Sequence, residues 1–127
     1  MKEYHYKEIK NRFYPLIPVS FYDQEVNTFA LVDSGSMISL FQEEVAKQLR
    51  INIKLGIPKH LQGVGGRILV YLHQIPIEVA GKRFNCQIAF SEEYGASFNI
   101  LARKDFFELF RIIFEEKNKM LILKEID

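Results

Sequence analysis

The sequence predicts a mainly β fold with two short helices, in a single domain over residues 1–127. Two observations carry this prediction. Short apolar runs alternate with polar or Gly-containing turns along the chain, and no linker, repeat or low-complexity tract divides them. The length is sufficient to bury a core without disulfides or metals, but it is too short for two catalytic lobes.

Seven segments have the apolar patterning of strands. They are residues 12–21, 26–32, 51–55, 67–79, 83–90, 111–115 and 119–126. Pro15, Pro18 and Pro76 restrict parts of them to sheet edges or strand ends, because proline cannot donate to a ladder. Residues 80–82 and 116–118 are typical of hairpin loops, so we expect each to join the strands on either side of it.

Two other segments predict helices. Ser39 and Gln42 have the spacing of a capping box, and good helix formers come after them, so we expect a helix from Ser39 to Leu49. The second expected helix covers residues 103–110. It carries too many large apolar side chains for a solvated helix, so they must fill a core or an interface. These side chains are Phe106, Phe107, Leu109 and Phe110.

Composition excludes several classes of function. The 17 Lys and Arg nearly balance the 16 Asp and Glu, which gives no electrostatic case for a nucleic-acid or membrane partner. Cys86 is the single cysteine, so we expect a reducing, cytoplasmic compartment, and the alternation around it predicts a core-facing strand residue. The three histidines have no ligand spacing, so we expect neither a metal nor another cofactor.

Asp33 is the most informative acidic residue. It follows the apolar run 29–32 and precedes Ser34, Gly35 and Ser36. Burial disfavours an ionised carboxylate unless donors surround it. Glycine permits a close backbone approach and a serine hydroxyl can hydrogen-bond across a turn. An isolated Asp-Ser-Gly sequence, such as residues 33–35, is ordinarily a structural turn between strands.

Three stretches, in fixed order, resemble the retroviral-type (retropepsin-like) aspartic proteases. Residues 30–36, Ala-Leu-Val-Asp-Ser-Gly-Ser, resemble that family's apolar strand running into Asp-Thr/Ser-Gly-Ala/Ser. Residues 62–67, Gln-Gly-Val-Gly-Gly-Arg, are similar to its Gly-rich flap tip, and residues 74–82 are similar to the hairpin after the flap. Residues 99–103, Asn-Ile-Leu-Ala-Arg, are similar to its Asn-Ile-hydrophobic-Gly-Arg segment. The resemblance covers roughly residues 29–114.

The resemblance implies a small closed β-barrel or sandwich of the retropepsin-like acid-protease type. It also implies a metal-independent aspartic endopeptidase that cleaves extended peptides or proteins. That chemistry needs two carboxylates sharing one proton, so that one activates a water and the other protonates the carbonyl oxygen. This chain carries one such motif, so the resemblance implies a homodimer with Asp33 of each subunit on the symmetry axis.

The resemblance also implies roles for residues around Asp33. The active-site turn is supported by Ser34, Gly35 and Ser36; the substrate-binding flap contains Gly63, Val64, Gly65 and Gly66; the motif behind the active site is Ile100, Leu101, Ala102 and Arg103. Without the resemblance, residues 62–66 are a plain turn. A phosphate-binding loop is disfavoured there, because no helix N-terminus or Lys-Ser/Thr pair comes after the glycines.

Two departures from the family pattern leave an alternative open. Ala102 stands where the family usually has glycine, and no acidic residue in 36–38 can pair with Arg103, which must find another partner or face solvent. Ala102 favours a catalytically weak or inactive domain of the same fold, acting in dimerisation or peptide binding. In either case the termini, Phe106, Phe107 and Phe110 are candidate dimer contacts.

Overall fold

The computed structural model describes residues 1–63 and 65–127. Strands make up 56% of the chain and helices 12%, which confirms the mainly β prediction. The strands are β1 (Lys2–His5), β2 (Lys7–Ile9), β3 (Arg12–Tyr14), β4 (Leu16–Phe21), β5 (Val26–Val32), β6 (Ser39–Phe41), β7 (Ile57–Gly63), β8 (Gly66–Val79), β9 (Lys82–Phe90), β10 (Asn99–Leu101), β11 (Phe110–Glu115) and β12 (Met120–Glu125). The helices are α1 (Glu43–Gln48) and three 3₁₀ turns, Tyr22–Gln24, Ile53–Leu55 and Phe107–Leu109.

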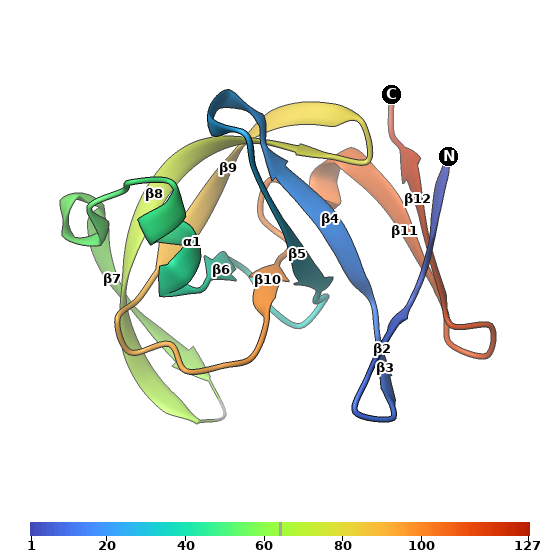
Figure 1. Cartoon of the computed structure of the whole chain (residues 1–127), viewed down its shortest axis with the longest axis horizontal. Helices are drawn as coiled ribbons and strands as arrows, with labels where there is room; N and C mark the ends of the chain where they lie inside the picture. Colours follow the sequence, from blue (N-terminus) through green and yellow to red (C-terminus); the bar gives the residue numbers. More distant parts are fainter. Residues whose placement is uncertain (64) are drawn as a thin grey trace.

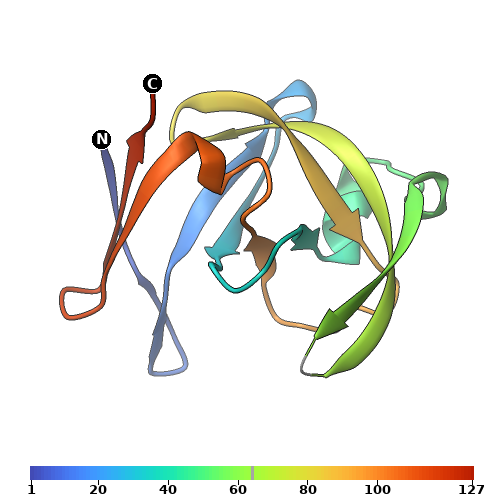
Figure 2. The same ribbon diagram turned by 180° about the vertical axis from the view of Figure 1, so that it is seen from behind.

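The main sheet has seven strands in the order β4-β5-β10-β6-β9-β8-β7 (Figure 1). A further pair, Ser20 with Glu78, joins β4 to β8 and closes six of these strands into a ring of hydrogen bonds. A separate sheet, in the order β1-β12-β11, brings the two termini side by side, as Figure 2 also shows.

The core is one cluster of buried side chains to which the main sheet, α1 and the β1-β12-β11 sheet all contribute. In β8 every second side chain is buried near its C-terminal end, and β9 alternates in the same way as far as Ile88, after which Ala89 and Phe90 are both buried. Cys86 has no exposed surface, which confirms its predicted place in the core. Burial raises the pKa of the Cys86 thiol to about 12, so it is protonated and unreactive at neutral pH.

The predicted helix from Ser39 to Leu49 is wrong over its first residues. Ser39–Phe41 forms β6, which pairs in parallel with β9 and antiparallel with β10. The Ser39 hydroxyl accepts the Ala102 amide hydrogen at 2.9 Å instead of capping a helix. Pairing with distant strands therefore overrides the local capping pattern, and α1 begins only at Glu43.

The predicted helix over residues 103–110 is also wrong. Asp105 has a φ of 70°, in the left-handed region, which interrupts helical geometry. The chain then forms the 3₁₀ turn Phe107–Leu109, and Phe110 already belongs to β11. Phe106 and Phe110 are 0% and 4% exposed, so they fill this chain's own core and cannot serve as the predicted dimer contacts.

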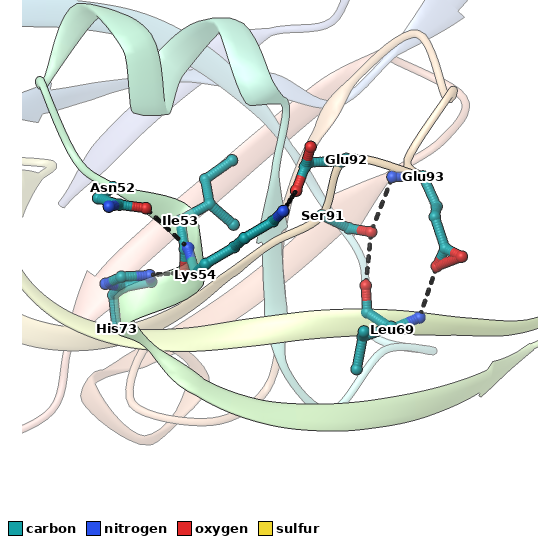
Figure 3. Close-up of polar contacts among 8 residues, drawn as sticks. All are labelled: Asn52, Ile53, Lys54, Leu69, His73, Ser91, Glu92 and Glu93. Carbon is teal, nitrogen blue, oxygen red and sulfur yellow. Dashed lines mark hydrogen bonds and ion pairs between the residues drawn. The ribbon is translucent and has the colours of Figure 1, made fainter.

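Other boundaries also differ from the prediction. Residues 51–55 form no strand, because the Asn52 side chain accepts the Lys54 amide and starts the 3₁₀ turn Ile53–Leu55 (Figure 3). The predicted strand 12–21 is divided at Pro15. Both predicted hairpins are confirmed: Ala80 and Gly81 have φ of 52° and 82° between β8 and β9, and a turn joins β11 to β12.

Candidate active site

Asp33 lies immediately beyond β5, where three short segments meet. β10 pairs in parallel with β5 and antiparallel with β6, so it lies between the two strands that flank Asp33 in sequence. The Asp33 amide continues this pairing by donating to the Leu101 carbonyl at 3.0 Å. Residues 33–38, which we call the Asp33 turn, therefore cross the end of β10.

The Asp33 carboxylate accepts a hydrogen bond within its own turn. The Gly35 amide donates to Asp33 Oδ1 at 2.8 Å, a charge-assisted bond of the kind that stabilises an ionised acid. A Cβ placed on Gly35 would lie 3.2 Å from the same oxygen, which is tighter than ordinary van der Waals contact. Glycine therefore permits the close approach of amide and carboxylate, as predicted from the Ser-Gly sequence.

The predicted motif at residues 100–103 lies against the Asp33 turn. The Arg103 amide donates to the Ser36 carbonyl at 3.0 Å, and the Lys104 amide donates to the Met37 carbonyl at 2.9 Å. Ala102 has no exposed surface and its φ is not positive, so its backbone does not require glycine. Arg103 is exposed and, within the described part of the chain, forms no ion pair.

Asn99 is a structural residue whose role was not predicted from sequence. Its Oδ1 accepts the Gln42 amide at 2.8 Å, and its Nδ2 donates to the Phe29 carbonyl at 2.9 Å and to Thr28 Oγ1 at 3.2 Å. The side chain is buried, so these bonds replace water. Asn99 thus joins β5, β10 and the start of α1 behind Asp33. An amide at the start of an apolar run was the signal that could have identified it.

The predicted Gly-rich segment forms the tip of an antiparallel hairpin. β7 and β8 pair from Ile57–Leu72 to Gly63–Gly66. Gly66 has a φ of 110°, a region that favours glycine, while Gly63 and Gly65 are exposed. Val64, the fourth predicted residue, lies outside the described residues. The tip, the Asp33 turn and the loop after β9 lie at the same end of the molecule (Figure 1).

Two adjoining cavities lie beneath the hairpin, and we call them together the hairpin groove. One, of about 450 Å³, is lined by Ser36, Leu40, Leu61, Gln62, Gly63, Gly65, Gly66, Ile68, Glu93, Tyr94, Gly95 and Ala96. The other, of about 480 Å³, is lined by Gly35, Ser36, Met37, Ile38, Lys59, Leu61, Gln62 and Gly63. The shared lining residues come from the Asp33 turn and the hairpin, so the groove passes between these two elements.

The 91–98 loop forms a wall of the groove that sequence patterns did not identify. Tyr94 in this loop donates its hydroxyl to the Phe98 carbonyl at 2.6 Å. Burial and, to a smaller extent, the negative charge of Asp33 raise the pKa of Tyr94. The loop is polar and irregular, so no periodicity marked it as part of a site.

Among residues 1–63 and 65–127, no group of three or more His, Cys, Asp or Glu side chains is arranged to hold a metal ion. No helix in the same ranges is long and apolar enough to cross a membrane. No protein-family model matches the chain, and a search of curated proteins found no significant match.

Proposed function

We propose that this protein is a homodimeric aspartic endopeptidase of the retropepsin-like type. One observation carries the proposal: Asp33 follows a core strand, accepts the Gly35 amide at 2.8 Å, and lies in a turn bonded to residues 101–104 beside the hairpin groove. A carboxylate fixed by a backbone donor next to a groove is suited to act as a general acid–base group. The β7–β8 hairpin takes the role of the flap.

The reaction needs a second carboxylate. With two acids sharing one proton, the ionised acid removes a proton from a water as that water attacks the peptide carbonyl. The protonated acid donates to the carbonyl oxygen, which gives a neutral gem-diol intermediate. The acid that took the water's proton then passes it to the leaving nitrogen as the C–N bond breaks, and the other acid takes back the hydroxyl proton, so the pair again holds one proton. Asp105 is occupied structurally, because its Oδ2 accepts the Gln87 amide at 2.8 Å. We therefore assign the second carboxylate to Asp33 of another copy, related by a two-fold axis.

The groove supports an extended peptide as substrate. Leu40, Leu61 and Ile68 give it an apolar lining, and hairpin residues and the Asp33 turn lie on opposite sides. A peptide bound there in extended form can pair with backbone groups, while its side chains enter the apolar cavities. We expect a preference for apolar side chains next to the cleaved bond.

The surface beside Asp33 supports pairing with a second copy. Met37 lies in the Asp33 turn and is 61% exposed, which is high for a large apolar side chain. An axis that brings two Asp33 side chains together must pass beside this turn. Phe107, which is half-buried, remains a candidate contact.

Asp33→Asn is the direct test. Purified wild type and variant are incubated with a peptide library from acidic to neutral pH, with and without pepstatin A, and products are identified by mass spectrometry. We expect pepstatin-sensitive cleavage by wild type and a loss of about 10³-fold or more in Asp33→Asn. Asp23→Asn is the matched control, because Asp23 is an exposed acid in the turn before β5.

The result distinguishes the proposal from its alternative. Equal cleavage by wild type and Asp33→Asn contradicts the assignment of Asp33. A wild-type protein that binds pepstatin but cleaves no peptide identifies a peptide-binding module of this fold instead.

A further inference from the structure

Strand β9 leaves the sheet before its partner β8 ends. The last pair between them is Tyr71 with Phe90, although β8 continues for five residues on the N-terminal side of Tyr71. The direction of the backbone hydrogen bonds alternates from one residue to the next along a strand. The amide and carbonyl of Leu69 therefore point toward the side of β9, as those of Tyr71 do. Those of Val70 point toward Lys59 of β7. Leu69 therefore has no partner in β9 for its amide and carbonyl, although it is still aligned with His60 of β7.

Two side chains replace the missing strand at Leu69 (Figure 3). Ser91 Oγ donates to the Leu69 carbonyl at 2.6 Å, and Glu93 Oε2 accepts the Leu69 amide hydrogen at 2.8 Å. Ser91 Oγ also accepts the Glu93 amide at 3.0 Å, which fixes the two side chains relative to each other. We call this arrangement the Leu69 clamp.

Glu92, which lies between Ser91 and Glu93 in the sequence, shows which backbone partner of Leu69 the clamp replaces. If β9 continued in its register, the backbone of Glu92 would pair with Leu69. Its side chain instead lies 3.7 Å from Lys54 Nζ, away from β8 (Figure 3). Ser91 has no exposed surface, and backbone groups next to it need partners if water is excluded. The clamp supplies those partners and lets the chain turn away.

The clamp connects two walls of the hairpin groove. Leu69 is next to Ile68, which lines the groove from the hairpin, while Glu93 begins the opposite wall that continues to Ala96. The Gln42 side chain donates to the Ala96 carbonyl at 2.9 Å and holds the far end of that wall. The 91–98 loop is therefore hydrogen-bonded to β8 near one end and to Gln42, which precedes α1, near the other.

We infer that Ser91 and Glu93 are positioning residues that set the width of the hairpin groove by substituting for a strand partner of Leu69. The effect of the clamp on cleavage rests on the function proposed above, but the clamp itself is independent of any activity. Removing the Glu93 carboxylate frees the Leu69 amide and lets the wall at Glu93–Ala96 move away from the hairpin.

Amide hydrogen exchange measured by NMR on the whole chain tests the clamp without a substrate. In Glu93→Ala, exchange at Leu69 is expected to rise about tenfold relative to Val70, which keeps its bond to β7. Glu93→Gln retains an acceptor oxygen and is expected to stay within about threefold of wild type. Glu92→Ala, which removes only the exposed ion pair with Lys54, is the matched control and should leave Leu69 unchanged.

Each outcome bears on one part of the inference. Equal acceleration of amide exchange at Leu69 and Val70, or equal effects of Glu92→Ala and Glu93→Ala, overturns the clamp whatever the chain's activity.

Kinetics with a peptide that wild type cleaves test the effect on the groove. Glu93→Ala should raise KM several-fold with kcat nearly unchanged, and Glu93→Gln should restore KM. A protected Leu69 amide in a protein that cleaves nothing contradicts the proposed function but leaves the clamp intact. An unchanged KM in Glu93→Ala overturns the role in groove width.

Discussion

The Asp33 turn and the β7–β8 hairpin face each other across the groove, yet they are held in opposite ways. The turn is bonded to a distant segment by the amides of Asp33, Arg103 and Lys104. In the hairpin, β7 pairs with β8 alone within the described residues, and on the N-terminal side of Tyr71 the Leu69 clamp ties β8 to the 91–98 loop. A catalytic group has to be held in position before the reaction, whereas a cover has to admit a substrate. The contrast supports different roles for the two regions.

Asn99→Ala should produce the largest loss of stability, because Asn99 joins β5, β10 and the start of α1 behind the Asp33 turn. The substitution leaves the Gln42 amide and the Phe29 carbonyl without their partner in a buried site. We expect the free energy of unfolding to fall by about 2–3 kcal/mol, measured by urea denaturation.

Asn118→Ala provides the control for that loss. Asn118 is exposed and, among the described residues, its side chain makes only a 3.4 Å bond to Glu115. We expect a change of about 0.5 kcal/mol or less. A similar loss in the two variants would show that Asn99 is no anchor.

Gly35→Ala and Gly65→Ala compare the turn with the hairpin directly. A methyl group on Gly35 meets Asp33 Oδ1 at 3.2 Å, while among the described residues no atom lies within 4 Å of one on Gly65. We expect Gly35→Ala to lower kcat/KM about tenfold, because the carboxylate must shift, and Gly65→Ala to lower it by less than about threefold.

The same pair of variants also tests the contrast by stability. The free energy of unfolding of each variant, measured in urea, should lie within about 1 kcal/mol of that of wild type, because the crowded site at Gly35 is near the surface. If Gly65→Ala is the more damaging change to catalysis, the hairpin rather than the turn is the precisely positioned element, and the comparison is reversed.

The smallest expected effect is on the titration of Tyr94, which lies across the groove from the turn. Burial and the Asp33 charge disfavour the phenolate and raise the Tyr94 pKa above its ordinary value of about 10. Because the folded state favours the neutral phenol, the contribution of Tyr94 to the free energy of unfolding is fully present below about pH 10. This contribution is lost as the pH rises through the raised Tyr94 pKa. Asp33→Asn should lower the Tyr94 pKa, as measured by NMR of labelled tyrosine. An unchanged pKa would place the two side chains too far apart to interact.

Local sequence signals predicted the parts of the fold that depend on neighbours in sequence. The β8–β9 hairpin results from alternating apolar residues and the Ala80–Gly81 turn. The strand leading to Asp33 and the close Gly35 amide were likewise evident from residue type and order. Period-two burial and glycine conformations are local properties, so no distant contact was needed to predict them.

The rest depends on contacts between distant segments. β10 has three residues and forms because β5 and β6 lie on either side of it, so its length alone gave no strand signal. Ser39 fits a capping box yet pairs within the sheet, because tertiary contacts exceed a local preference. Ser91 and Glu93 belong to a polar loop whose partner, Leu69, becomes apparent only when β9 is seen to end early.

Mixing wild type with Asp33→Asn tests the central claim most directly. If each active site needs Asp33 from both copies, and the subunits exchange freely, cleavage falls as the square of the wild-type fraction. An equal mixture then retains about a quarter of the wild-type rate at the same total protein concentration. A linear fall, to about half, would show that one Asp33 is enough for each active site and would contradict the shared catalytic pair.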